Sequence, residues 1–362
     1  MKAFVTGGTG FIGSYLIRRL VQKGYQVSAL VRSPQDAAAF EASGVRAVIG
    51  DIRERESLRA GMTGSDVVFH AAAWYKIGAK DWQTAEAINV EGTRNVLSLA
   101  HELGVARIVY TSTVAVFGDT RGIVASETSP APGEPFLTEY DRTKWRAHFL
   151  AAVPLMAQGA PVIIVMPGAV YGPGDGSQMG QMLEWFYRGR FPLFPAPDLS
   201  ITLAHVEDIV EGHILAAERG RPGESYILAG PTFNMRQVVE LWAEISGRPA
   251  PLLYLPPALV KPFAPLMAWL NRFVALPELL SAEAIKMTGA SYLARSDKAR
   301  QELGWQTRPV VDGLQATLAH LDQTLPALPP EQIRRRFVGG AALVLGVGLA
   351  FAWLAMRRKK RR

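Results

Sequence analysis

Residues 1–13 read MKAFVTGGTGFIG and join a short apolar run to three glycines, Gly7, Gly10 and Gly13. A helical pattern of apolar residues overlaps the last glycine and continues beyond it. A strand, a G-x-x-G-x-x-G turn and a helix, in this order, are the context in which a turn binds the pyrophosphate of a dinucleotide. In such a turn Gly7 allows the tight bend, Gly10 admits the phosphates to backbone N–H groups, and Gly13 lets the helix pack on the strand. We therefore predict a dinucleotide cofactor at this turn, rather than an ordinary strand–helix connection.

Composition narrows the range of functions. The chain has 362 residues, 49% of them hydrophobic, and no cysteine, which excludes disulfides, thiolate metal sites and a cysteine nucleophile. We predict no metal site. The net charge of +7 comes from two basic clusters at 334–336 and 357–362, without which the balance would be near −2. The remaining chain therefore gives no reason to expect nucleic-acid binding.

Apolar runs alternate with helical patterns through the first half of the chain, at 25–32, 45–52, 66–73, 107–113 and 161–167. This alternation predicts an α/β fold with a Rossmann-type, doubly wound parallel sheet. A smaller C-terminal substrate domain is expected to follow it. The expected division is 1–170 for the cofactor domain with 205–230 returning to it, 171–204 and 231–324 for the substrate domain, and 325–336 for a linker.

The end of the second predicted strand indicates which cofactor binds. NAD-binding sites usually carry an acid there, which hydrogen-bonds the ribose 2′-hydroxyl. This chain has Arg32, whose charge and planar donor fork suit a 2′-phosphate. The alternative is a solvated arginine at a strand end. We predict that NADP is preferred over NAD.

Tyr140 and Lys144 lie four residues apart on a predicted helix and therefore share one face. A lysine ammonium and an oxidised nicotinamide ring beside a tyrosine would favour its phenolate, so that Tyr140 could exchange a proton near neutral pH. Thr113, at the end of the fifth predicted strand, could hydrogen-bond the substrate oxygen. A tyrosine and a lysine at this spacing also occur as an exposed pair on helix surfaces. The glycine turn earlier in the chain favours the catalytic interpretation over a surface pair.

At this point the chain resembles the extended short-chain dehydrogenase/reductase family, also called the NAD-dependent epimerase/dehydratase family. The matching pieces follow the family's order over residues 1 to roughly 230 and are TGGTGFIG at 6–13, GDI at 50–52, HAAA at 70–73, NVEGT at 89–93, YTSTVAVFG at 110–118, YDRTK at 140–144, PGAVYGPGD at 167–175 and HVEDI at 205–209. SDKARQELGW at 296–305 extends the match. The resemblance is greatest to the branch of dihydroflavonol 4-reductases and hopanoid-associated sugar epimerase-like proteins.

The resemblance implies a role for each matching residue. Thr113, Tyr140 and Lys144 would be catalytic, and Asn89 would support them. The cofactor would contact the glycine turn with Phe11 and Ile12, then Asp51 and Ile52 at the adenine, Ala71, Ala72 and Ala73 along its length, and Pro167 and Val170 near the nicotinamide.

At two places the chain departs from the family pattern, and these departures indicate which of the family's reactions to expect. Val114 and Ala115 stand where sugar-nucleotide dehydratases carry an Asp-Glu pair, so the acid and base for elimination are missing. Residues 200–204 are apolar where epimerases usually have an arginine for the diphosphate. The expected activity is an oxidoreductase that reduces a ketone or oxidises a secondary alcohol. A sugar (nucleotide) epimerase and a non-catalytic NAD(P)-binding scaffold remain alternatives.

The substrate is expected to be a small, apolar, lipid-like molecule. Trp74, Tyr75, Trp185 and Tyr187 are candidates for an aromatic pocket, although each of them could equally belong to the core. The sequence leaves a homodimer open.

The C-terminal region contains twenty residues without a charge, 337–356. As a helix they would span about 30 Å, the thickness of a bilayer core. Basic clusters flank them on both sides, and 357–362 would form a basic tail. We therefore expect a transmembrane helix at 337–356, a single-pass anchor in the lipid bilayer, rather than a buried terminal helix. The catalytic domain would face the cytoplasm, because no secretory signal is evident and the cofactor pool is cytosolic.

Overall fold

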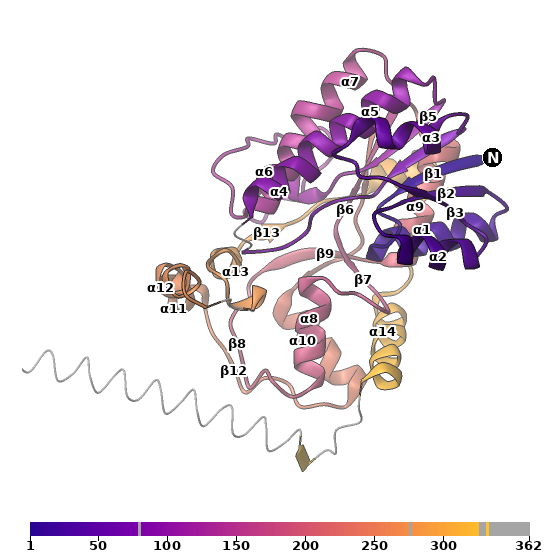
Figure 1. Ribbon diagram of the computed structural model, residues 1–362. Coiled ribbons are helices and arrows are strands. Elements are labelled where there is room, and N and C mark those ends of the chain that lie inside the picture. The colour runs from indigo at the N-terminus through magenta and orange to yellow at the C-terminus, as the bar shows by residue number, and fades with distance from the viewer. Residues whose placement is uncertain (79–80, 275–276, 326–330, 333–362) are drawn as a thin grey trace, which may run out of the picture.

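A seven-stranded, wholly parallel sheet is the centre of the fold (Figure 1). The structure, a computed structural model, describes residues 1–78, 81–274, 277–325 and 331–332. Across the sheet the strands follow the order β10-β6-β5-β4-β1-β2-β3. The strands are β1 (Lys2–Thr6), β2 (Gln26–Val31), β3 (Arg46–Ile49), β4 (Val67–His70), β5 (Arg107–Thr111), β6 (Val162–Pro167) and β10 (Ser225–Leu228). The strand order reverses between β1 and β4, where such sheets bind ligands beyond the carboxyl ends of their strands. The predicted Rossmann-type sheet is confirmed.

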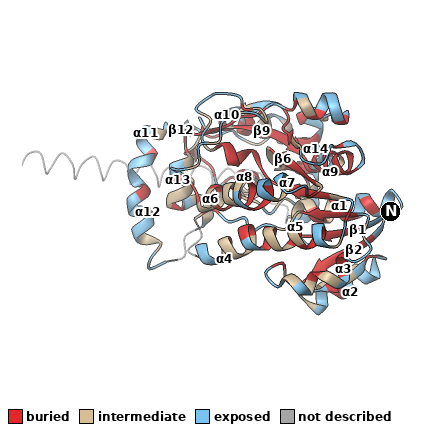
Figure 2. Ribbon diagram, turned by 90° about the horizontal axis from the view of Figure 1, so that it is seen from above, coloured by how far each residue is buried: buried red, intermediate tan, exposed pale blue. Residues whose placement is uncertain are grey.

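Both faces of the sheet are covered, as the burial colours of Figure 2 show. Along β1, Ala3 and Val5 join the core on one face and Phe4 the core on the other, because successive side chains alternate across a strand. The first core lies under α1 (Phe11–Gln22) and α9 (Val206–Arg219). The second lies under α5 (Thr93–Glu102), and the remaining helices of this region are α2 (Pro34–Ala42), α3 (Arg59–Met62), α4 (Trp82–Glu86), α6 (Glu139–Arg146) and α7 (Val153–Ala157).

Besides Ala299–Leu303, two π-helical stretches of the described chain interrupt regular α-helix. A π-helical stretch, Ala87–Gly92, joins α4 to α5, and another, Ala147–Ala152, joins α6 to α7. The two stretches pack against each other beneath the site described below. π-Helical turns are frequent at functional sites. The sequence pattern does not reveal them, because the apolar spacing continues through both.

A smaller sheet and a second set of helices form the rest of the described chain. Its strands are β7 (Ala169–Tyr171), β9 (Ser200–His205), β11 (Thr232–Asn234) and β13 (Ser291–Tyr292), with β8 (Leu193–Phe194) and β12 (Leu253–Tyr254) paired separately. Its helices are α8 (Gln178–Tyr187), α10 (Met235–Ser246), α11 (Pro257–Val260), α12 (Ala264–Leu270), α13 (Ala282–Met287) and α14 (Val310–Thr324). The core of this region is aromatic, with Phe186 packed on the fully buried Trp242.

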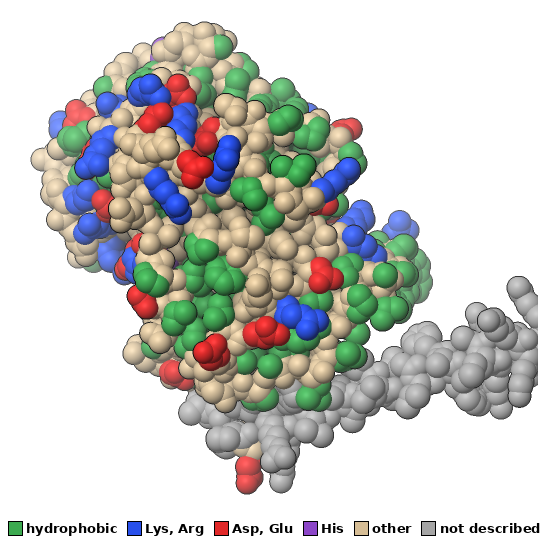
Figure 3. All heavy atoms as spheres, turned by 180° about the vertical axis from the view of Figure 1, so that it is seen from behind, with side chains coloured by type: hydrophobic (Ala, Val, Ile, Leu, Met, Phe, Trp, Pro, Cys, Tyr) green, Lys and Arg blue, Asp and Glu red, His purple; other side chains and the backbone are tan. Residues whose placement is uncertain are grey.

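The segment containing α11 and α12 stands out from the body and exposes large apolar side chains, among them Phe263, Leu266 and Trp269. Figure 3 shows apolar side chains gathered on this protrusion. Charged side chains of both signs are interspersed on the opposite side of the same view.

The membrane prediction is corrected. Within the described residues no helix is long and apolar enough to cross a membrane. The range predicted to form the transmembrane helix, 337–356, lies outside the described residues. A single-pass C-terminal anchor and the membrane localisation that depends on it are therefore not supported.

Candidate active site

The glycine turn between β1 and α1 is built for a close backbone approach. Gly7 has φ +79°, and a Cβ there would lie 2.5 Å from the backbone nitrogen of Ala72. A Cβ on Gly13 would lie 2.1 Å from the Gly7 carbonyl oxygen. Gly10 is the N-cap of α1, and no side chain caps the helix, so the first N–H groups have no partner within the helix or from a capping side chain. This arrangement fits the pyrophosphate of a dinucleotide, which helix N-termini bind through these groups.

A cavity of about 1000 Å³ opens beside this turn, at the carboxyl ends of β1, β5 and β6. It brings together most of the predicted site. The predicted residues that line it are Gly7, Gly10, Phe11, Ile12, Gly13, Ala71, Ala73, Tyr75, Thr113, Tyr140, Lys144, Pro167 and Val170.

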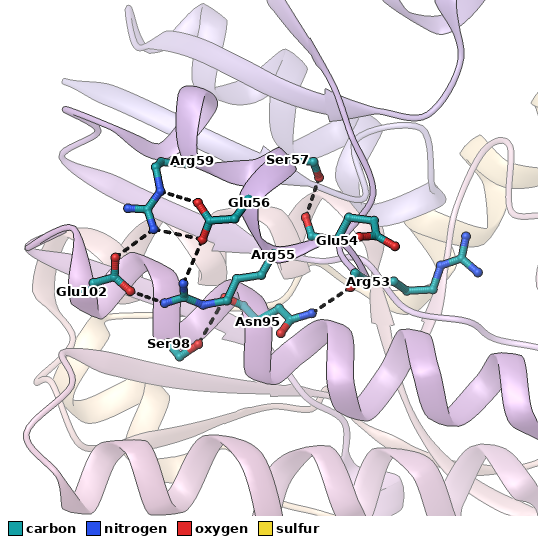
Figure 4. A network of polar contacts seen from close by, with 9 residues as sticks. All are labelled: Arg53, Glu54, Arg55, Glu56, Ser57, Arg59, Asn95, Ser98 and Glu102. Carbon is teal, nitrogen blue, oxygen red and sulfur yellow. Dashed lines mark hydrogen bonds and ion pairs between the residues drawn. The ribbon is translucent and has the colours of Figure 1, made fainter.

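The predicted adenine residues lie beyond this cavity. Arg32 is exposed just after β2, and Ile52 is buried in the loop after β3. The Asp51 carboxylate accepts hydrogen bonds from Arg53 Nε at 3.0 Å and Nη2 at 2.7 Å, which hold the pKa of Asp51 below its usual range. Figure 4 shows Asn95 beneath this loop, where its Nδ2 donates to the Arg53 carbonyl at 3.2 Å. The same group also donates to the Ile52 carbonyl at 3.0 Å. The loop is therefore held in place by hydrogen bonds from the chain itself.

Three consecutive hydroxyl residues mark the end of β5, and each is held in place. Thr111 Oγ1 lies 2.8 Å from His213 Nε2, and Ser112 Oγ lies 2.8 Å from His148 Nδ1. Burial lowers the pKa of both imidazoles, to about 4 for His213 and about 3 for His148, so both are neutral hydrogen-bonding partners. Thr113 Oγ1 accepts the N–H of the second residue after it, at 3.2 Å. The hydroxyl expected to meet the substrate is thus oriented by local structure.

Helix α6 carries Tyr140 and Lys144, and Thr138 caps its N-terminus. The Lys144 ammonium donates to the Thr111 carbonyl at 2.8 Å and to the Tyr110 hydroxyl at 3.3 Å. Burial lowers the pKa of Lys144 to about 7. Burial also raises the pKa of Tyr140, against a hydrogen bond from Thr113 that lowers it. Lys144 is therefore hydrogen-bonded to the end of β5, and burial favours the neutral phenol of Tyr140.

Asn89 supports the loop that covers Tyr140. Its Oδ1 accepts from the Trp74 N–H at 2.7 Å, and its Nδ2 donates to the Trp74 carbonyl at 3.0 Å and to Thr143 Oγ1 at 2.9 Å. The next residue, Tyr75, meets Tyr140 edge to face with ring centroids 4.6 Å apart. Asn89 therefore holds the loop that places the Tyr75 ring against Tyr140.

The other two aromatic candidates lie elsewhere. Trp185 packs on Phe191 in the core of the second region. The Tyr187 ring lies 3.5 Å beneath the Arg248 guanidinium, and its hydroxyl is hydrogen-bonded to Asp322. Neither residue is among those that line the cavity.

The far wall of the cavity is mostly apolar and comes mainly from the second region. Its apolar members are Met179 and Met182 of α8, Leu199, Ile201 of β9, Met235 and Met287, and its polar members include Ser177, Gln178 and His320. Val114 and Ala115, which follow β5, add apolar surface from the sheet region. Lysine and arginine among the described lining residues are limited to Lys144 and to Arg18 of α1. Sequence reasoning missed the four methionines because they come from separate elements that form no linear pattern. Asp141 and Tyr292 also line the cavity and were missed.

Comparison with known proteins agrees with this geometry. A model of the NAD dependent epimerase/dehydratase family matches residues 3–229. The chain is similar to a 4-hydroxy-2-methyl-3-oxo-4-farnesyl-3,4-dihydroquinoline-1-oxide ketoreductase of Stigmatella aurantiaca, 35% identical over 85% of this chain and 92% of the relative. It is also similar to a putative dihydroflavonol 4-reductase of Synechocystis, 34% identical over 83% of this chain and 89% of the relative.

Among solved structures, UDP-glucose 4-epimerase of Thermotoga maritima superimposes with a TM-score of 0.72, over 90% of this chain and all of that chain. At 20% identity this likeness shows the shared fold alone. The family match covers the glycine turn and the helix that carries Tyr140 and Lys144. The chain therefore belongs to the NAD-dependent epimerase/dehydratase family of extended short-chain dehydrogenases/reductases, and it is an NAD(P)-dependent enzyme that acts as an oxidoreductase or an epimerase.

Proposed function

We propose that this enzyme is a reductase of apolar ketones and, in reverse, a dehydrogenase of the corresponding secondary alcohols. The observation that carries the proposal is the apolar far wall of the cavity. A nucleoside diphosphate sugar needs cations for its diphosphate, and beyond α1 and Lys144 the described lining has no lysine or arginine. Four methionines instead provide a polarizable, adaptable wall suited to an apolar molecule. The Stigmatella relative, whose name includes a farnesyl group and a ketoreductase activity, supports the same class.

In the proposed mechanism Tyr140 donates a proton to the carbonyl oxygen of the substrate. Its raised pKa keeps the phenol protonated at neutral pH, which suits the direction of reduction. The Thr113 hydroxyl hydrogen-bonds the same substrate oxygen, and Lys144, bonded to the end of β5, holds the cofactor ribose. The bound nicotinamide supplies the hydride. Neither Val114 nor Ala115, which line the cavity after Thr113, can act as an acid or base for elimination.

The proposed cofactor preference is NADP over NAD. Arg32 is exposed at the end of β2 and forms no salt bridge with any residue that the structure describes. Its guanidinium is therefore available to a 2′-phosphate. Asp51, the acid that could otherwise compete for Arg32, is paired with Arg53.

Tyr140→Phe tests the mechanism, because it removes only the hydroxyl. A screen of apolar ketones that follows NADPH absorbance should find a substrate, and turnover should fall by at least roughly 10²-fold in the variant, the usual scale of acid–base catalysis. Cofactor binding should persist. Near-normal turnover in the folded variant would remove Tyr140 from the mechanism.

Dialysis of the purified enzyme separates reductase from epimerase. A reductase exchanges its cofactor at every turnover and should lose it to the buffer. A cofactor that stays bound through dialysis, with no ketone reduced, would favour the epimerase.

A further inference from the structure

Asp141 is the one acidic side chain among the described residues that line the cavity. It follows Tyr140 in α6 and is 2% exposed. The Tyr292 hydroxyl of β13 donates to its carboxylate at 3.0 Å, and the Thr138 hydroxyl also hydrogen-bonds it. Among the described residues no lysine or arginine forms a salt bridge with it. A carboxylate in this position presents an uncompensated negative charge to whatever occupies the cavity.

The ionisation of Asp141 falls in the neutral range. Burial raises its pKa to about 7, against the Tyr292 hydrogen bond, which lowers it. The titratable groups that face Asp141 are Tyr292 of β13, Glu283 of α13, Tyr75 of the loop after β4 and Tyr140 of α6. The other titratable groups among the described residues that line the cavity are Lys144 of α6, Tyr15 and Arg18 of α1, and His320 of α14. Glu283 is a partly buried carboxyl that does not line the cavity, and it accepts hydrogen bonds from the backbone N–H groups of Gly78 and Glu139.

We propose that Asp141 selects the charge class of the substrate: held beside Tyr140 by Tyr292, it repels molecules with a negative charge near the reacting carbonyl. The enzyme then prefers neutral ketones and secondary alcohols over oxo acids. The inference rests on the proposed function, since it concerns the substrate of that site. Like charges a few ångströms apart in a partly desolvated cavity disfavour binding by tenfold or more.

The exclusion of anions should become stronger as the pH rises. Asp141 is protonated below about pH 7 and ionised above it, so exclusion of anions grows as pH rises through this value. Lys144 loses its positive charge in the same range and also weakens anion binding as pH rises. A variant at Asp141 separates the two contributions. Loss of the Tyr292 hydrogen bond raises the pKa of Asp141, so exclusion should then begin at a higher pH.

Binding of two isosteric probes tests the inference without requiring turnover. Decanoate and undecan-2-one differ only in an anionic oxygen or a methyl group on the carbonyl carbon. Their Kd values are measured by calorimetry on the full chain with saturating NADP⁺, which cannot reduce the ketone and whose ring charge is the same in every variant. At pH 8, Asp141→Asn should lower the ratio of the decanoate Kd to the undecan-2-one Kd by at least about tenfold. Glu283→Gln, the matched loss of a nearby, partly buried carboxyl, should leave the ratio unchanged.

The outcomes distinguish selection from a purely structural role. An unchanged ratio in an Asp141→Asn protein that still binds undecan-2-one would overturn the inference. If that variant does not fold, Tyr292→Phe carries the test, and a pH profile of decanoate binding that does not move upward refutes it. Failure of both probes to bind the unmodified enzyme would refute the apolar substrate class. Binding with the expected ratio but no reduction of any ketone would leave the charge selection intact and overturn the reductase.

Discussion

Single residues at the site are held by neutral hydrogen bonds from distant parts of the chain. Ser112 depends on His148, 36 residues later, and Thr111 on His213, 102 residues later. Tyr140, Lys144 and Thr113 could be named from the sequence because their types and spacing carry the chemistry. Their partners could not, since a lone histidine in an apolar helix has no pattern that identifies the hydroxyl it will meet. For the same reason Asp141 could not be predicted as a site residue, because in the sequence it looks like an ordinary acid in the first turn of a helix.

The predicted preference for NADP over NAD depends on Arg32. Arg32→Asp should reduce the affinity for NADP relative to NAD by at least roughly tenfold, because a carboxylate would repel the 2′-phosphate that the guanidinium attracts. Cofactor titrations by fluorescence measure both affinities. Arg46→Asp is the control, since Arg46 is also exposed but stands at the amino end of the neighbouring strand β3. Equal ratios of NADP affinity to NAD affinity in the two variants would show that Arg32 does not bind the 2′-phosphate.

Elements with a strong periodicity could be predicted from the sequence, and those defined by tertiary contact could not. The apolar runs that form β1, β4 and β6 are buried along nearly their full length, so their strand character is visible locally. The short strands β8, β12 and β13 have two residues each and exist only because a partner strand lies beside them. Most of the substrate wall comes from α8, β9, α10 and α13 of the same region, which tertiary packing brings to one cavity. The cofactor side of the cavity was therefore easier to predict than the substrate side.

The glycine turn gives an element-scale prediction. Gly13→Ala should weaken cofactor binding by at least about tenfold, because the new Cβ would meet the Gly7 carbonyl at 2.1 Å and force β1 and α1 apart. Gly104→Ala is the control. Gly104, unlike Gly13, has a positive φ, +70°, and nothing lies within 4 Å of a Cβ there, so alanine should cost about 1 kcal/mol of stability and leave cofactor affinity unchanged. Equal cofactor affinity in both variants would mean that the close approach at Gly13 is not needed for the phosphate site.

At the scale of the whole molecule, the cavity lies between two separately packed regions. The parallel sheet and its helices provide Thr113, Tyr140 and Lys144, and the second region provides Met182, Ile201 and the other wall residues. The geometry between reacting groups and substrate wall is therefore set by how these regions pack. No local stretch of sequence encodes that packing, although composition and periodicity predict each region's fold class.

Two tryptophans of the second region test how its packing supports the wall. Trp242 is 1% exposed in the core of α8, α10 and α14, whereas Trp269 is 53% exposed on the protruding α12. Trp242→Ala should reduce the free energy of unfolding by about 3–5 kcal/mol, the usual cost of a buried aromatic, and Trp269→Ala by less than about 1 kcal/mol. Denaturant unfolding measures both. Because α10 also carries Met235 on the cavity wall, Trp242→Ala should raise the KM for a ketone substrate more than the Kd for cofactor, which binds to the sheet. An equal loss of substrate and cofactor affinity would show that the two regions do not act separately on the site.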